Sequence, residues 1–181
     1  MTRIVFAHGL EGSPDGTKAV YLRDKLGAVT PWLGEFNLDE QVGALEKEIP
    51  QGSDAVVVGS SLGGLAALGF AVRHTERIRH LVLLAPAVGM HRYASISPEV
   101  EQKRPGLFEQ SKKFGALSVP LSIRTTVIHG LQDDVIDKDD VIALVERSPS
   151  ATLLLVHDDH TLSGSRELIL RVVERAVSGK A

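Results

Sequence analysis

The chain has 181 residues, 43% of them hydrophobic, which is enough for one domain with a sizeable core and rather little for two. Its net charge of −3 arises from 20 basic and 23 acidic residues that are scattered along the sequence, so neither nucleic acid nor a membrane surface is indicated as a partner. Cysteine is absent, which excludes disulfides and cysteine nucleophiles. No apolar run approaches the roughly 20 residues that span a bilayer, and no signal peptide is evident. We expect a single cytoplasmic domain over residues 1–181 and leave its oligomeric state open.

Short apolar runs alternate along the chain with segments of helical periodicity. Five runs are nearly unbroken and rich in β-branched residues or leucine, as is typical of strands buried on both faces. These runs are 4–7, 55–58, 81–85, 126–129 and 153–156. A weaker run, 28–33, contains Pro31 and is expected at a sheet edge. The chain is thus predicted to form about six strands.

The segments between the strands carry helical patterns. Leu38, Val42 and Leu45 recur at helical spacing behind Asn37, which is expected to cap that helix. The helix that contains Ala19, Leu22 and Leu26 is expected to begin at a cap on Ser13 or Asp15. Strands that alternate with helices form a mostly parallel sheet with helices on both faces. The predicted fold class is α/β.

Residues 89–120 break this alternation. The segment is too long for one simple connection and is expected to hold two short helices around Pro105 and Gly106. We expect it to be an insertion that caps the functional site.

Ligands of an open α/β sheet bind where the strands end, so the residues after each strand are the candidates for chemistry. His8 follows the first predicted strand, Ser60 and Ser61 follow the third, Asp133 follows the fifth and His160 follows the sixth. Serine, aspartate and histidine therefore occur in the chain order that α/β-hydrolases use.

Glycine spacing distinguishes the two serines. A nucleophile on a sharp strand-to-helix turn needs small residues two positions before and after it. Ser61 has Gly59 and Gly63 at these positions, whereas Ser60 has Val58 and Leu62. Ser61 is therefore the predicted nucleophile.

A serine hydroxyl needs a base, and the base needs an acid that orients it. We expect His160 to be the base, because it lies beyond the last strand in a loop that can bend over the serine, and His157 is the alternative. Asp133 is the expected acid and Asp134 the alternative. Asp137 is expected to cap the following helix.

The remaining histidines have other expected roles. His8 and His129 are expected to shape loops through internal hydrogen bonds, and His74, His80 and His91 to be surface or packing residues. Histidines 157 and 160 at a strand end do not converge readily on an ion, so no metal site and no cofactor is predicted.

A serine hydrolase also needs donors for the oxyanion of its tetrahedral intermediate. The expected pair is the backbone N–H groups of Leu62 and Leu10. Glu11 is a possible substrate-binding residue beside them.

Four stretches together carry a resemblance to a known family: FAHGLEGSPDGTKAVYLRDKL, GSSLGG, HGLQDDVI and DDHTL. They resemble a compact α/β-hydrolase, similar to small bacterial esterases of the YqiA type and to serine hydrolases of the RBBP9 type. The resemblance covers the chain outside about 89–120 and implies a three-layer α/β-hydrolase sandwich. It assigns the nucleophile to Ser61, the acid to Asp133 and the base to His160. Larger members have an antiparallel hairpin before the first strand; we expect this chain to lack it and to form a small sheet.

The resemblance implies cleavage of a carboxylic ester or thioester through an acyl-enzyme. Met90, Tyr93 and Phe108 in the insertion are expected to line the site for an acyl chain, or else to pack the insertion onto the body. Four basic residues of the insertion are expected to face solvent or an anionic leaving group: Lys103, Arg104, Lys112 and Lys113.

Other functions remain open at this point. A hydrolase of another class, such as a peptidase or a perhydrolase, fits the same residues. A binding protein that retains the fold without catalysis is the alternative from a different class, because a fold alone does not determine function.

Overall fold

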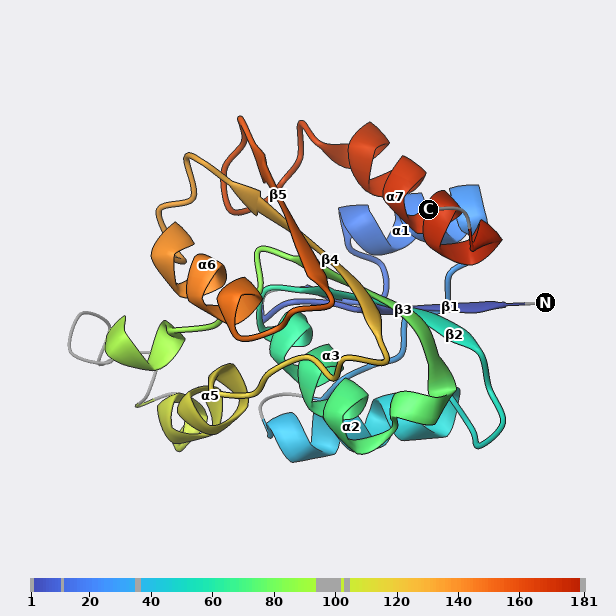
Figure 1. The fold of residues 1–181 in the computed structure, drawn as a ribbon, viewed down its shortest axis with the longest axis horizontal. Coiled ribbons are helices and arrows are strands. Elements are labelled where there is room, and N and C mark those ends of the chain that lie inside the picture. The colour runs from blue at the N-terminus through green and yellow to red at the C-terminus, as the bar shows by residue number, and fades with distance from the viewer. Residues whose placement is uncertain (1, 11, 35–36, 94–101, 103–104, 180–181) are drawn as a thin grey trace.

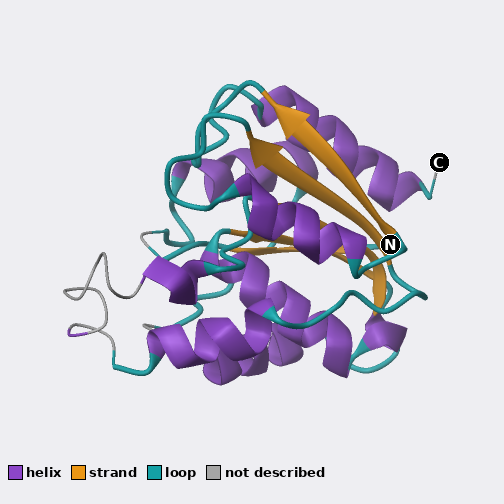
Figure 2. Cartoon of the chain, turned by 60° about the vertical axis from the view of Figure 1, so that its left-hand side comes forward, coloured by secondary structure: helices purple, strands orange, loops and turns teal. Residues whose placement is uncertain are grey.

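The computed structural model describes residues 2–10, 12–34, 37–93, 102 and 105–179. In this part of the chain the centre is one parallel sheet of five strands, ordered β1-β2-β3-β4-β5 (Figure 1). The strands are β1 (Arg3–Ala7), β2 (Ala55–Ser60), β3 (Ile78–Leu84), β4 (Arg124–Gly130) and β5 (Ala151–Val156). Because all strands run the same way, their carboxyl ends and the loops that follow gather at one edge of the sheet (Figure 2).

Helices cover both faces of the sheet, which gives the three layers that the sequence predicts. α1 (Thr17–Leu26) and α7 (Arg166–Ser178) lie on one face (Figure 1). α2 (Leu38–Glu48), α3 (Leu62–Arg73), α5 (Leu107–Gly115) and α6 (Lys138–Glu146) lie on the other. Alternate residues of a strand point to opposite faces, so Val57 of β2 joins the core under α3, while Val56 and Val58 join the core under α1 and α7.

The expected strand over 28–33 is reduced to one parallel bridge between Val5 and Val29. The N–H of Phe6 donates to the carbonyl of Val29 over 2.8 Å, and the N–H of Val29 donates to the carbonyl of Ile4 over 2.9 Å. Pro31 has no N–H to extend this pairing, which explains why a full sixth strand does not form.

The helix starts agree with the sequence in two cases and differ in one. Asn37 and Asp137 cap α2 and α6, each by accepting a hydrogen bond from the backbone N–H two residues on. The cap of α1 is Gly16, which offers no side chain, so the expectation of Ser13 or Asp15 was wrong. The first turn of α1 therefore keeps N–H groups without a side-chain partner.

The second half of the insertion packs onto the body of the domain. α5 packs beneath α3, where Phe114 is 1% exposed and fills the space beside Gly69. Arg147 donates to the carbonyls of Leu117 and Gly115 and so ties the end of this segment to the body. The expected cap residues Lys103 and Arg104 lie outside the described residues.

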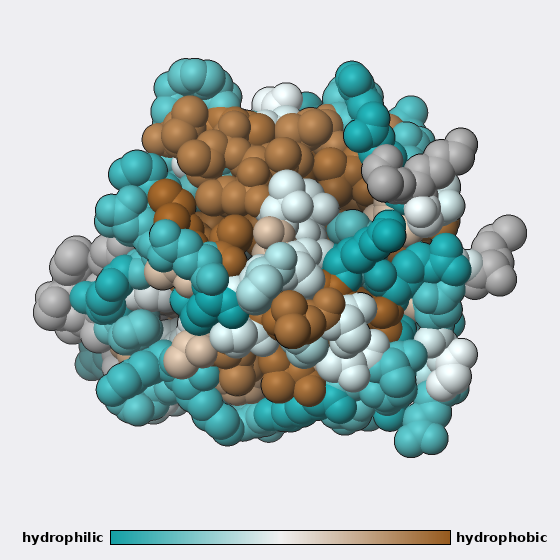
Figure 3. Space-filling model, in the orientation of Figure 1, coloured by the Kyte–Doolittle hydropathy of each residue, from teal (hydrophilic) through white to brown (hydrophobic). Residues whose placement is uncertain are grey.

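The surface over β5, the last strand in the order of the sheet, is partly apolar. Hydrophobic side chains gather over β5 (Figure 3), where Leu155 is 42% exposed. Within the described chain β5 pairs with β4 alone, so it forms an edge of the sheet. None of the described helices combines the length and the apolar character needed to cross a membrane.

Candidate active site

Ser61 occupies the sharp turn between β2 and α3. Its backbone has φ 53° and ψ −120°, a conformation that costs a non-glycine residue on the order of 1–3 kcal/mol. The turn is held by hydrogen bonds of Ser61 itself: its N–H donates to Leu84, and its carbonyl accepts from Gly64 and Ala87. Strain that the surrounding structure maintains in this way is typical of a nucleophile on an elbow.

The two glycines around Ser61 are required by space. A Cβ on Gly63 would overlap the carbonyl oxygens of Ala7 and His8 and would lie 2.6 Å from the Ala7 carbonyl carbon. A Cβ on Gly59 would lie 2.7 Å from the Gly63 oxygen. The close approach that the glycine spacing predicts is therefore present, and it brings the β1 end against the start of α3.

A chain of hydrogen bonds joins the three predicted residues. His160 Nε2 lies 3.0 Å from Ser61 Oγ, and His160 Nδ1 lies 2.8 Å from Asp133 Oδ2. Because an ionised carboxylate only accepts, Nδ1 carries the proton and Nε2 is free to accept from the serine hydroxyl. The residues come from three strand ends, at β2, β4 and β5.

The environment of Asp133 favours its charged form. Its side chain is fully buried, and this burial raises the pKa, but hydrogen bonds with His160 and with the backbone N–H groups of Ile136 and Val135 outweigh it. The net result is a pKa below the ordinary value for aspartate. Asp133 thus remains ionised where it orients His160.

His129 lies behind Asp133. It is fully buried, with Nδ1 3.6 Å from Asp133 Oδ2, and burial lowers its pKa. Among the described residues neither ring nitrogen makes a hydrogen bond of ordinary geometry, in contrast to the loop-shaping bond that the sequence suggests. His8 does make such a bond, from its Nδ1 to the carbonyl of Gly9 over 2.9 Å.

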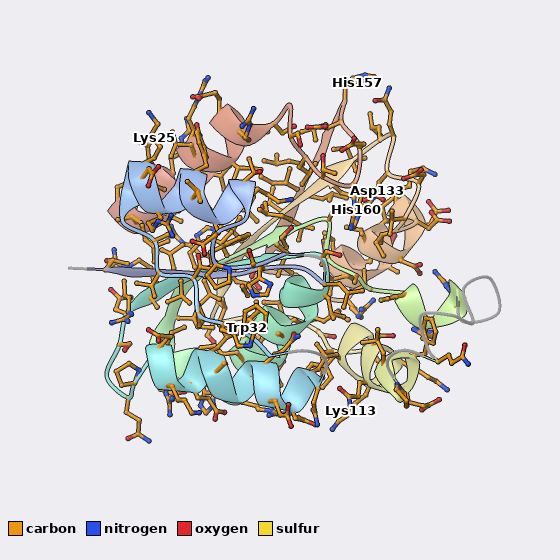
Figure 4. All side chains as sticks on the ribbon, turned by 180° about the vertical axis from the view of Figure 1, so that it is seen from behind. Lys25, Trp32, Lys113, Asp133, His157 and His160 are labelled. Carbon is orange, nitrogen blue, oxygen red and sulfur yellow. The ribbon has the colours of Figure 1, made fainter. Side chains whose placement is uncertain are left out.

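The alternative residues lie apart from this chain of hydrogen bonds. His157 is exposed and lies at the tip of the molecule, away from His160 and Asp133 (Figure 4). Asp134 is also exposed, and the side chain of Ser60 is buried at the end of β2. None of these three side chains has a hydrogen bond to the side chain of Ser61 or His160 in the described structure.

Leu10 and Leu62 are the residues whose backbone N–H groups we expect to stabilise the oxyanion. Both residues line the cleft that contains Ser61 and His160. No described residue accepts a hydrogen bond from either N–H, so both donors are available to a ligand.

This cleft has a volume of about 450 Å³ and two chemically different sides. Apolar residues come from the face with α3 and α6: Leu62, Ala87, Met90, Val135 and Ile136. Polar and cationic residues come from α1, from the segment between β5 and α7, and from the first residue of α7: Thr17, Lys18, Thr161, Ser163 and Arg166.

Of the residues expected to bind substrate, Met90 lines the cleft. Its short helix η2 (Met90–Tyr93) is tied to α6 by the ion pair between Arg92 and Asp140, which is 9% exposed. Phe108 is 7% exposed and is not a cleft residue, because α5 turns it into the packing of the body. Glu11 and the side chain of Tyr93 lie outside the described residues.

Two cleft residues were missed by sequence reasoning, Lys18 and Arg166. The sequence indicates basic residues of the insertion for this role instead. One of them, Lys113, lies on the outer side of α5, away from His160 (Figure 4), with its Nζ 3.8 Å from Asp39 Oδ2. The sequence does contain a sign that Lys18 has a functional role. A basic residue in the first turn of a helix is unfavourable for the helix dipole, so its presence there needs another reason. Within the described residues no cluster of histidine, aspartate and glutamate is arranged to hold a metal ion.

Comparisons with known proteins agree with this architecture. Residues 37–113, less than half of the chain, match the family model described as "Serine aminopeptidase, S33". A search of curated proteins found no significant match.

Many solved structures are similar. Alpha/beta hydrolase domain-containing protein 10 from mouse has a TM-score of 0.81 at 16% identity, covering 97% of this chain and 89% of its own. A putative hydrolase of the alpha/beta superfamily from Xanthomonas campestris has a TM-score of 0.72 at 23% identity, covering 99% of both chains. Est1E from Butyrivibrio proteoclasticus has a TM-score of 0.76 at 15% identity, covering 98% of this chain and 87% of its own. The parallel sheet, the strained serine turn and these likenesses together identify the chain as a compact protein of the α/β-hydrolase fold.

Proposed function

We propose that this protein is a serine hydrolase that cleaves a carboxylic ester or thioester through an acyl-enzyme on Ser61. The observation that carries the proposal is the unbroken hydrogen-bond chain from Ser61 Oγ through His160 to Asp133. Such a chain supplies the base and the orienting acid that a serine hydroxyl requires.

In the proposed mechanism, Ser61 Oγ attacks the acyl carbon while its proton moves to His160 Nε2. The carbonyl oxygen becomes an oxyanion, which the free N–H groups of Leu10 and Leu62 stabilise. His160 then gives its proton to the leaving oxygen or sulfur, and the acyl group stays on Ser61. Water, activated by the same histidine, attacks the acyl-enzyme and restores the serine.

Asp133 has a supporting part in each step. Its low pKa keeps the carboxylate charged, so it stabilises the imidazolium that forms on His160 and fixes the proton on Nδ1. The apolar side of the cleft, which includes Met90 and Ile136, is suited to the acyl chain.

A peptidase is the second candidate, because the matching family model carries an aminopeptidase description. An aminopeptidase must bind a free, positively charged amino group. The described residues that line the cleft include Lys18 and Arg166 but no aspartate or glutamate. These two cations disfavour a positively charged amino-terminus and so support an ester or thioester substrate.

Turnover of 4-nitrophenyl esters of increasing chain length tests the proposal, with alanine 4-nitroanilide as the peptidase substrate. We expect ester hydrolysis that Ser61→Ala and His160→Ala each reduce by at least about 10³-fold. The matched control is His157→Ala, which should change the rate less than twofold, because His157 is exposed outside the site. Ester hydrolysis that persists in Ser61→Ala, or that is lost in His157→Ala and kept in His160→Ala, contradicts the proposal.

A further inference from the structure

The polar side of the cleft is built around the loop that carries the proposed base. Lys18 Nζ donates to the carbonyl of Thr161 over 2.7 Å, and Arg166 Nε donates to the carbonyl of Ser163 over 3.0 Å. Both carbonyls belong to the segment that directly follows His160. In the proposed mechanism His160 gives its proton to the leaving group, so cations attached to the segment after His160 are candidates to contact that group.

Neither cation is neutralised by an ion pair. No carboxylate of the described residues lies within 4.0 Å of Lys18 Nζ or of the Arg166 guanidinium. The two carboxylates whose charge acts on Lys18 have hydrogen-bond partners of their own: Asp158 accepts from Ser165, and Asp159 accepts from Thr161. Burial lowers the pKa of Lys18, while Asp158 and Asp159 raise it from a distance.

The position of Lys18 has no structural advantage for its helix. A cation in the first turn of α1 is repelled by the positive end of the helix dipole, and the turn lacks an acidic residue and a side-chain cap. The helix dipole therefore disfavours the ammonium at this position, and a bound anion would offset that contribution. The uncapped N–H groups of the same turn add to the local positive potential.

A second cavity extends the cleft at this point. Its volume is about 280 Å³, and it shares Gly9, Gly12, Thr17 and Lys18 with the cleft. His8, which is 6% exposed, lines it, and His8 Nε2 has no hydrogen-bond partner among the described residues. The cavity lies beside the uncapped start of α1 and offers space for a polar ligand group.

We propose that the substrate's leaving group carries a carboxylate or phosphate, which Lys18 and Arg166 bind beside His160. This inference rests on the proposed hydrolase function and specifies its substrate class. The apolar side of the cleft then takes a neutral acyl chain. The charged group would lie over the first turn of α1 and reach toward the second cavity.

The test compares esters that are neutral, that carry a negative charge on the leaving group, or that carry it on the acyl group. The neutral reference is 4-carbamoylphenyl butyrate, and the anionic leaving groups are those of 4-carboxyphenyl butyrate and 4-phosphonooxyphenyl butyrate. A monophenyl ester of succinic acid places the carboxylate on the acyl side instead. We expect at least one anionic leaving group to raise kcat/KM about tenfold over the reference, mainly through KM, because a charge-assisted hydrogen bond contributes about that much. The preference should shrink in 0.5 M NaCl.

Matched variants assign the effect to the two cations. Lys18→Met and Arg166→Gln should each lower the anionic-to-neutral ratio at least threefold, and Lys18→Arg should retain it. The controls are Lys25→Met, which is on α1 far from His160 (Figure 4), and Arg171→Gln on the exposed side of α7; both should leave the ratio unchanged. Circular dichroism establishes that each variant is folded.

Several results would overturn the inference. A wild-type ratio near one, a preference for the acyl-side carboxylate, or equal losses on charged and neutral esters in Lys18→Met would each do so. Equal losses would mean that Lys18 supports the His160 loop through Thr161 and does not bind substrate.

Binding to Ser61→Ala separates this inference from the proposed function. Titration calorimetry measures the Kd of each ester for Ser61→Ala. An ester with an anionic leaving group should have a lower Kd than the carbamoyl ester, even if the wild type turns over no ester. Equal Kd values would refute the anion site. Hydrolysis of the neutral ester that depends on Ser61 would leave the hydrolase function standing in that case.

Discussion

Replacing Gly63 by alanine tests the close approach on which the serine turn depends. The new Cβ would overlap the carbonyl oxygens of Ala7 and His8 and lie 2.6 Å from the Ala7 carbonyl carbon, roughly 1 Å inside the optimum for carbon atoms. The obstacle is backbone, so no side chain can rotate away. The end of β1 or the start of α3 must move.

The expected cost lies at the upper end of the range for overpacking, about 3 kcal/mol in the free energy of unfolding. For a chain of this size, that corresponds to a fall in Tm of roughly 6–12 °C. Activity should fall further than stability alone requires. Movement of the β1 end displaces Leu10 relative to Leu62, and loss of one oxyanion donor lowers kcat by about 10²-fold or more.

Gly43→Ala is the matched control. Gly43 lies within α2, and a Cβ there meets nothing within 4 Å. Alanine should therefore stabilise the helix by about 0.5–1 kcal/mol and leave kcat unchanged. Urea titrations followed by circular dichroism, together with ester turnover, measure both variants. Wild-type stability and kcat in Gly63→Ala would refute the close-approach argument.

Further predictions concern the acid and the insertion. Asp133→Asn should lower kcat by about 10³-fold or more, because asparagine cannot stabilise the imidazolium on His160. The folded-state pKa of Asp133 is depressed, so its stabilising contribution is present above the ordinary value of 3.8 and is lost as the pH falls through the folded value. Urea titrations at several acidic pH values should show this loss in the wild type and a smaller one in Asp133→Asn. Phe114→Ala should cost about 3 kcal/mol of stability, since the ring is buried against α3, yet leave KM for short esters unchanged. A large change in KM with full stability would mean that α5 acts as a lid.

The parts of the fold that the sequence predicts well are those set by local patterns. Buried strands appear as unbroken apolar runs, and Asn37 and Asp137 identify helix starts through their own side chains. The proximity of Ser61, Asp133 and His160 follows from a general rule of parallel sheets. The carboxyl ends of the strands lie at the same side of the sheet, so residues that follow different strands come close together.

The parts that it predicts poorly depend on contacts between distant segments. Lys18 reaches the cleft because α1 packs beside the segment before α7, and its partner Thr161 is 143 residues away in sequence. Phe108 carries the same apolar signal whether it lines a cleft or the core, and only the packing of α5 under α3 decides between them. Pro31 is a further example. It correctly indicates that residues 28–33 lie beside the edge of the sheet, but it does not predict that their pairing is limited to the single bridge between Val5 and Val29.

The central claim is that Ser61 is the nucleophile, and covalent labelling tests it most directly. The wild-type protein is treated with a fluorophosphonate, its intact mass is measured, and the modified residue is located by digestion and tandem mass spectrometry. We predict a single adduct on the peptide that contains Ser61, absent from Ser61→Ala and from heat-unfolded protein, because only the folded site activates the hydroxyl. An adduct on another residue, or ester turnover by a protein that shows no adduct at Ser61, would contradict the account.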